Sequence, residues 1–78
     1  MGISRSDAIK RLEALLQQVE GHLRKIADEP ESQAVPHWKG EIEVFLRRME
    51  DLLPHVGKRT SAEWATKIEK CRAALEEK

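Results

Sequence analysis

The sequence predicts an all-α protein, an antiparallel (up-down-up) three-helix bundle. Apolar residues recur at alternating steps of three and four in three segments, which is the spacing of one face of an α-helix. Proline, glycine and hydroxyl residues separate these segments, and none of them has the alternation of period two that a half-buried strand needs. A chain of 78 residues is too short for several cores, so we expect residues 1–78 to form one helical-bundle domain.

The first predicted helix covers about residues 5–28. Its apolar stripe consists of Ile9, Leu12, Leu16, Val19, Leu23 and Ile26. Leu15 lies beside this stripe, so the apolar face is wide enough for two neighbouring helices. Ser4 and Asp7 resemble a capping box at the start of the helix, and Pro30 prevents the helix from continuing far beyond its end.

The second predicted helix covers about residues 36–53. Pro36 suits the first turn of a helix, because its missing N–H would have no intrahelical partner there. The apolar stripe of this segment consists of Trp38, Ile42, Phe45, Met49, Leu52 and Val56. Pro54 interrupts the pattern, so we expect regular helix to end near Leu53 and Val56 to anchor the chain just beyond it.

The third predicted helix covers about residues 61–76. Thr60 and Glu63 stand three residues apart, and we expect them to form a capping box at its start. The apolar stripe consists of Trp64, Ile68, Cys71 and Leu75, and it is thinner than the other two. A thin stripe buries less apolar area, so we expect it to leave part of the first two stripes uncovered.

The composition argues against several classes of protein. Fourteen basic and fourteen acidic residues cancel, so the domain lacks the overall positive field that nucleic-acid and anionic-membrane binders use. A single cysteine cannot form an internal disulfide, and no apolar run has the length of a membrane span or of a secretory signal. We therefore expect a small soluble protein of the cytoplasm.

The sequence also lacks the motifs that indicate catalysis. It contains no glycine-rich phosphate loop, no hydrolase elbow and no dinucleotide fingerprint. The spacing of His22, His37 and His55 puts them on different faces and does not match a zinc site. Cys71 lies in an apolar stripe, so we expect it to be a buried small side chain. We expect no enzyme activity, no cofactor and no metal.

The favoured function is a small non-enzymatic protein–protein interaction module that buries an apolar helical surface against itself or another protein. We expect a homodimer rather than a monomer, because small cores gain stability from association. A third helix roughly 24 Å long cannot cover a first helix roughly 36 Å long. An uncovered apolar patch marks an interface, so we expect the partner to bind at the far end of the bundle. The predicted contact residues are Leu23, Ile26, Val35 and Trp38.

A second hypothesis is a nucleic-acid-associated regulator. Basic side chains gather around the connection between the second and third helices, where they could bind phosphates. They are Arg47, Arg48, His55, Lys58 and Arg59. Acidic residues such as Glu63 and Glu69 on the third helix would oppose its entry into a DNA groove. The two hypotheses differ in salt dependence, because phosphate contacts weaken steeply as salt rises whereas apolar contacts persist.

Overall fold

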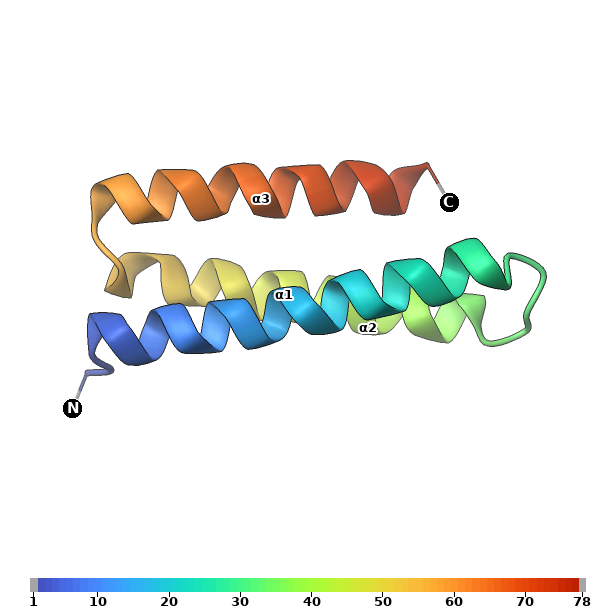
Figure 1. Ribbon diagram of the computed structural model, residues 1–78, viewed down its shortest axis with the longest axis horizontal. Coiled ribbons are helices and arrows are strands. Elements are labelled where there is room, and N and C mark those ends of the chain that lie inside the picture. Colours follow the sequence, from blue (N-terminus) through green and yellow to red (C-terminus); the bar gives the residue numbers. More distant parts are fainter. Residues whose placement is uncertain (1, 78) are drawn as a thin grey trace.

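Three α-helices form the part of the chain, residues 2–77, that the computed structural model describes (Figure 1). Helix α1 spans Arg5–Asp28, α2 spans Val35–Leu52 and α3 spans Lys58–Glu76, with a short 3-10 helix, η1, at Leu53–His55. Successive helices run in opposite directions, so the two chain ends lie at opposite ends of the bundle. The predicted all-α, up-down-up three-helix bundle is confirmed for these residues.

The ends of the α1–α2 hairpin follow from local hydrogen bonds that the sequence indicates. Ser4 caps α1, because its Oγ accepts a hydrogen bond from the Asp7 N–H at 3.1 Å. In the turn after α1, Ser32 Oγ accepts from the Ala34 N–H at 3.1 Å. Pro36 lies in the first turn of α2, as predicted. The predicted bounds of the first two helices are therefore confirmed to within a residue, with η1 following α2 where Pro54 ends the regular helix.

The predicted start of the third helix is wrong. Helix α3 begins at Lys58, three residues before the expected start, and Gly57 is its N-cap. The Ser61 N–H donates to the Gly57 carbonyl oxygen at 2.8 Å, so Thr60 already lies inside the helix and no side chain caps it. Gly57 has φ +82°, a conformation that lets the chain turn directly from η1 into α3. The backbone of a glycine thus replaces the expected capping box.

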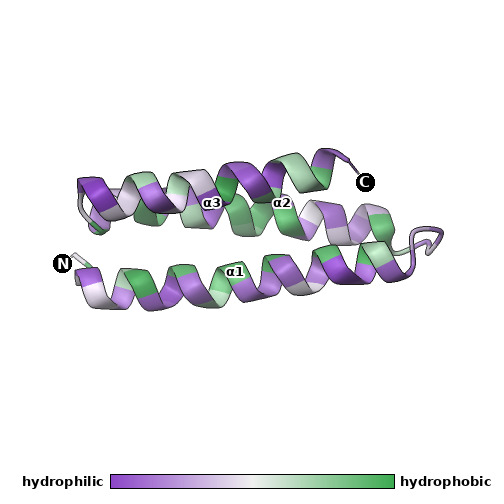
Figure 2. Ribbon diagram, turned by 45° about the horizontal axis from the view of Figure 1, so that its top comes forward, coloured by the Kyte–Doolittle hydropathy of each residue, from purple (hydrophilic) through white to green (hydrophobic). Residues whose placement is uncertain are grey.

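The core lies along the centre of the bundle, where the apolar faces of the three helices meet (Figure 2). The largest fully buried side chains are Leu12, Val19, Ile42, Leu46, Met49, Val56 and Ile68. Val56 follows η1 and is 1% exposed, so the predicted anchor beyond the second helix is confirmed. Most of these residues belong to α1 and α2, which makes the hairpin the larger part of the core.

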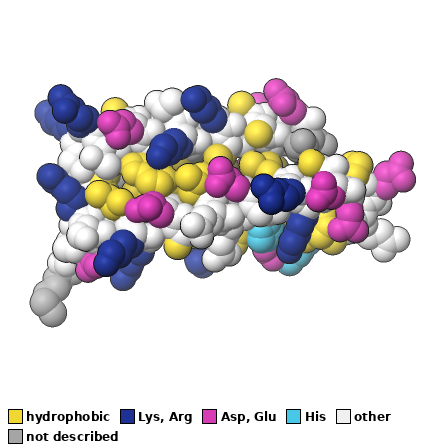
Figure 3. All heavy atoms as spheres, viewed as in Figure 1, with side chains coloured by type: hydrophobic (Ala, Val, Ile, Leu, Met, Phe, Trp, Pro, Cys, Tyr) yellow, Lys and Arg dark blue, Asp and Glu magenta, His cyan; other side chains and the backbone are white. Residues whose placement is uncertain are grey.

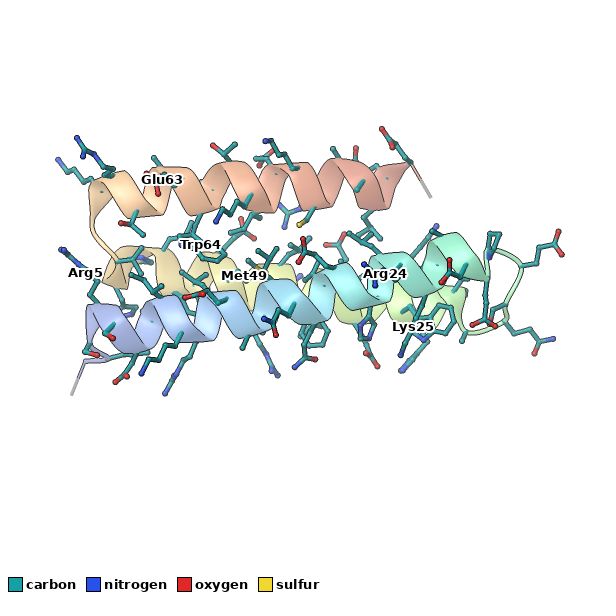
Figure 4. All side chains as sticks on the ribbon, viewed as in Figure 1. Arg5, Arg24, Lys25, Met49, Glu63 and Trp64 are labelled. Atoms are coloured by element: carbon teal, nitrogen blue, oxygen red, sulfur yellow. The ribbon has the colours of Figure 1, made fainter. Side chains whose placement is uncertain are left out.

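Helix α3 covers the hairpin with only three buried side chains, Trp64, Ile68 and Leu75. Trp64 points from α3 into the space between the helices, toward the part of α2 that carries Met49 (Figure 4). On the side of α2, Arg72 forms an ion pair with Glu50, with 3.1 Å between Nη2 and Oε1. Figure 1 shows that α3 ends before α1 does, so the turn end of the hairpin extends beyond it.

None of the helices within residues 2–77 is both long enough and apolar enough to cross a membrane.

The connection at Gly57 generates a first prediction. A Cβ at this position would lie 3.0 Å from Nη2 of Arg5, whose side chain extends from the start of α1 toward this connection (Figure 4). Because positive φ also strains any side-chain-bearing residue, Gly57→Ala should lower the free energy of unfolding by about 1–3 kcal/mol. Gly21→Ala is the matched control. Its Cβ would meet open space on α1, so it should raise stability by about 0.5–1 kcal/mol. Urea unfolding measures both, and equal effects would contradict the strain at Gly57.

Candidate interaction surface

The four predicted contact residues at the turn end of the bundle fall into two groups, two that are buried and two that are half-buried. Ile26 is 2% exposed and Val35 is 9% exposed, so both belong to the core of the monomer. Leu23 and Trp38 pack against this core while remaining half-buried. Lys25 Nζ lies 6.0 Å from the centre of the Trp38 ring, at the outer limit of a cation–π contact. Of the four predicted contact residues, only Leu23 and Trp38 therefore offer apolar surface.

A longer apolar surface lies between α1 and α3. Leu16 of α1 and Cys71 of α3 line a shallow hollow of about 240 Å³ between the two helices, which we call the α1–α3 groove. Ile9 and Leu23 stand one heptad before and after Leu16, and both are half-buried against the core. Residues seven apart lie on the same helix face. These three α1 side chains therefore form one apolar edge along the groove.

Charged side chains border the α1–α3 groove. Glu20 lines it from α1, whereas Lys67 and Lys70 line it from α3. Figure 3 shows the resulting surface as a band of hydrophobic side chains between α1 and α3, with acidic and basic side chains around it. Among the described residues no ion pair joins α1 to α3 across this band, because the three ion pairs are His22–Glu41, His37–Glu41 and Arg72–Glu50. No ion pair among the described residues therefore closes the groove.

The prediction that Cys71 is buried is wrong in degree. Cys71 is half-buried, because the α1 and α3 backbones pack less closely than those of the hairpin and leave the thiol in the floor of the groove. Partial burial raises the pKa of the Cys71 thiol above its ordinary value, and the negative charge of Glu20 raises it further. At neutral pH the thiol is therefore protonated and poorly nucleophilic.

On the opposite side of α1, two histidines meet one carboxylate. His22 of α1 lies with Nε2 2.5 Å from Oε2 of Glu41, and His37 lies with Nε2 2.6 Å from Oε1. His22 Nδ1 also donates to the Gln18 carbonyl oxygen at 2.8 Å, and its ring contacts Phe45 edge-to-face, with 5.4 Å between ring centres. The hydrogen bond from His22 is the main cause that lowers the pKa of Glu41.

The sequence prediction that the histidines lie on different faces is therefore wrong for His22 and His37. In the hairpin, His22 lies six residues before the end of α1 at Asp28, and Glu41 lies six residues after the start of α2 at Val35. Antiparallel packing brings such positions together. The pairing of His37 with Glu41 at i, i+4 is visible in the sequence. The contact with His22 needs the register of the hairpin, which the length of the turn sets.

Two of the predicted phosphate-binding residues line different hollows. Arg48 borders a hollow on the α1–α2 side together with Arg11 and Asp51, whereas Lys58 borders a separate hollow at the η1–α3 connection. The predicted phosphate-binding residues, Arg47, Arg48, His55, Lys58 and Arg59, stay a prediction. Within residues 2–77, no group of three His, Cys, Asp or Glu side chains has an arrangement that could hold a metal ion.

Comparison of the chain with protein-family models, with curated proteins and with solved structures finds no match. The fold and its surface define a small three-helix protein with an open apolar groove, and its function is inferred from its own residues.

The cluster around Glu41 generates a prediction about acid stability. Because folding lowers the pKa of Glu41, its stabilising effect is complete above about pH 4.3, the ordinary pKa of glutamate, and is lost as the pH falls through the lowered value. Glu41→Gln should therefore destabilise the protein most above this pH, and the difference from wild type should shrink in acid. Urea unfolding across the acid range measures it. Glu13→Gln, in an exposed position of α1 outside the cluster, is the control. An identical pH profile for both substitutions would contradict the assignment.

The raised pKa of Cys71 generates a prediction about thiol reactivity. In dilute solution at about pH 7.5, a maleimide should modify Cys71 in the folded chain more slowly than in the chain unfolded by urea, because the thiolate is the reactive form. Glu20→Gln should increase the rate in the folded chain, since it removes a negative charge that opposes the thiolate. Stopped labelling reactions followed by mass spectrometry measure these rates. A folded chain that reacts as fast as the unfolded one would show that the groove does not protect the thiol.

Proposed function

We propose that the protein is a small non-enzymatic protein–protein interaction module that acts through the α1–α3 groove. The observation that carries this proposal is the continuous apolar edge formed by Ile9, Leu16 and Leu23, which α3 leaves half-covered. An apolar band of this length bordered by charged side chains is typical of a surface that another protein covers. The proposal keeps Leu23 from the predicted contact set and moves the centre of the surface along α1 to Leu16.

The chemistry of the groove supports binding rather than catalysis. A catalytic cysteine needs an activating base and a lowered pKa, whereas the pKa of Cys71 is raised and the acid beside it is Glu20. The His22–Glu41–His37 cluster joins α1 to α2, and the hydrogen bonds of its carboxylate are directed to the two histidines. We propose for this cluster the role of fixing the hairpin.

The nucleic-acid hypothesis has less support, because acidic residues such as Glu63 and Glu69 on α3 would oppose its entry into a DNA groove. The two hypotheses predict different responses to substitutions in the groove and to salt. Binding at the connection around Lys58 and Arg59 would not respond to changes in the groove and would weaken steeply as salt rises.

The proposed function predicts where a partner can be cross-linked. The photoreactive amino acid p-benzoylphenylalanine, introduced in place of Lys70 at the edge of the groove, should form covalent adducts with the partner in lysate of the cells that produce the protein. The matched control places the same amino acid at Lys10, which is also an exposed lysine but lies on α1 outside the lining of the groove. Adducts should form from position 70 and not from position 10.

Competition decides whether the apolar floor is responsible. Excess unlabelled wild-type chain should abolish the adducts, whereas excess Leu16→Glu chain should not, because a buried carboxylate in the interface is costly. Circular dichroism checks that the Leu16→Glu chain is folded, and Leu23→Glu is the second variant if it is not. Equal adducts from positions 10 and 70, or equal competition by the wild-type and Leu16→Glu chains, would show that the groove is not the binding surface.

A further inference from the structure

Helix α3 is attached to the other two helices by few contacts. Of its 19 residues only Trp64, Ile68 and Leu75 are buried, whereas α1 and α2 bury four side chains each. Among residues 2–77, the one side-chain hydrogen bond that joins α3 to another helix runs from Arg72 to Glu50. These two side chains are 32% and 46% exposed, so solvent screens the ion pair and its contribution to stability is small. Helix α3 is therefore the least firmly held of the three helices.

The α1–α2 hairpin has contacts of its own that do not involve α3. The buried side chains of α1 and α2 belong to one core cluster, so each helix of the hairpin packs on the other. His22 of α1 hydrogen-bonds Glu41 of α2, and its ring packs edge-to-face on Phe45. These contacts remain when α3 moves away. The part of the core that α3 covers would then be exposed, so such an open state is a minor population.

The connection between α2 and α3 supplies a pivot for such a motion. Val56 is 1% exposed and holds the end of η1 in the core. The next residue, Gly57, has φ +82°, and regular helix begins directly after it at Lys58. Glycine has the widest backbone freedom of any residue. A rotation about the Gly57 backbone therefore moves α3 as one rod while Val56 stays in place. Figure 1 shows this connection at one end of α3, beside the start of α1.

We propose that α3 is a hinged cover, which swings away from the α1–α2 hairpin about Gly57 while the hairpin stays folded. Segments with few buried apolar contacts open at a lower free energy than the whole protein. In the open state the α1 edge at Ile9, Leu16 and Leu23, which α3 leaves half-buried, becomes accessible across its full width. The inference concerns a motion of the single chain, so it stands whether or not the proposed function is correct.

Native-state hydrogen exchange of the full chain, followed by NMR at increasing urea concentrations below the unfolding transition, tests this motion. The amides between Trp64 and Leu75 should share one opening equilibrium. This opening should be at least about tenfold more populated than the opening that exposes the slowest amides of α1 and α2. Because the swing exposes less surface than global unfolding, the exchange of α3 should also depend less steeply on urea.

Two substitutions separate the swing from global unfolding. Ile68→Val removes a methyl group from the contact between α3 and the hairpin, so it should accelerate exchange in α3 and in the hairpin by the same factor of several-fold. Glu41→Gln acts between α1 and α2 and changes the closed and open states alike. It should accelerate exchange in the hairpin and leave the exchange of α3 unchanged.

Two outcomes would overturn the hinged cover. Equal acceleration of α3 and the hairpin by Glu41→Gln would show that α3 opens only when the whole chain unfolds. Protection that declines steadily from Trp64 to Leu75 would show fraying from the C-terminal end of α3 in place of a swing about Gly57. Neither outcome affects the cross-linking from position 70, which tests the proposed function separately.

Discussion

The constraint on which the rest of the structure depends is the small apolar surface of α3. Helices α1 and α2 supply most of the core, and α3 adds little to it. The hairpin presents wide apolar faces on both of its helices, and α3 covers them with Trp64, Ile68 and Leu75 alone. Burial of apolar area is the main source of stability for a domain of this size. Because the apolar stripe of α3 is thin, the monomer buries less apolar area than its hairpin offers. Ile9, Leu16 and Leu23 on α1 are the side chains that α3 leaves incompletely buried. A partner that covers this edge would add the missing burial.

The two sides of α1 are held in different ways. Toward α2, His22 contacts the second helix twice, because it hydrogen-bonds Glu41 and its ring packs edge-to-face on Phe45. Toward α3, Glu20 and the lysines face each other across an apolar floor without an ion pair among the described residues. The hydrogen-bonded side chains fix the two helices of the hairpin relative to each other. The charged side chains along the groove, which form no ion pair across it, can pair with another surface. The asymmetry is consistent with a rigid hairpin that carries an interaction surface on one side.

The connection before α3 sets where this surface begins. Gly57 has a backbone conformation that suits glycine, and it starts α3 earlier than a hydroxyl cap at Thr60 would. The Arg5 side chain lies against this glycine, so the start of α1 and the start of α3 are at the same height. Because the two helices run in the same direction from that level, residues of equal height line the groove together. The placement of Glu20 beside Lys67, Lys70 and Cys71 follows from this alignment.

The sequence by itself determined the fold class, the bounds of α1 and α2 and most of the core, because helical periodicity, Ser4, Pro36 and Pro54 act locally. It also indicated that the apolar stripe of the third helix is narrower than the other two. Only the tertiary structure decided that Gly57 caps α3, that His22 reaches Glu41 and that Ile26 and Val35 are buried. These outcomes depend on backbone conformation in a turn and on the register between helices, and residue spacing along one helix carries no information about either. The groove likewise arises from the relative height of α1 and α3, which no single segment specifies.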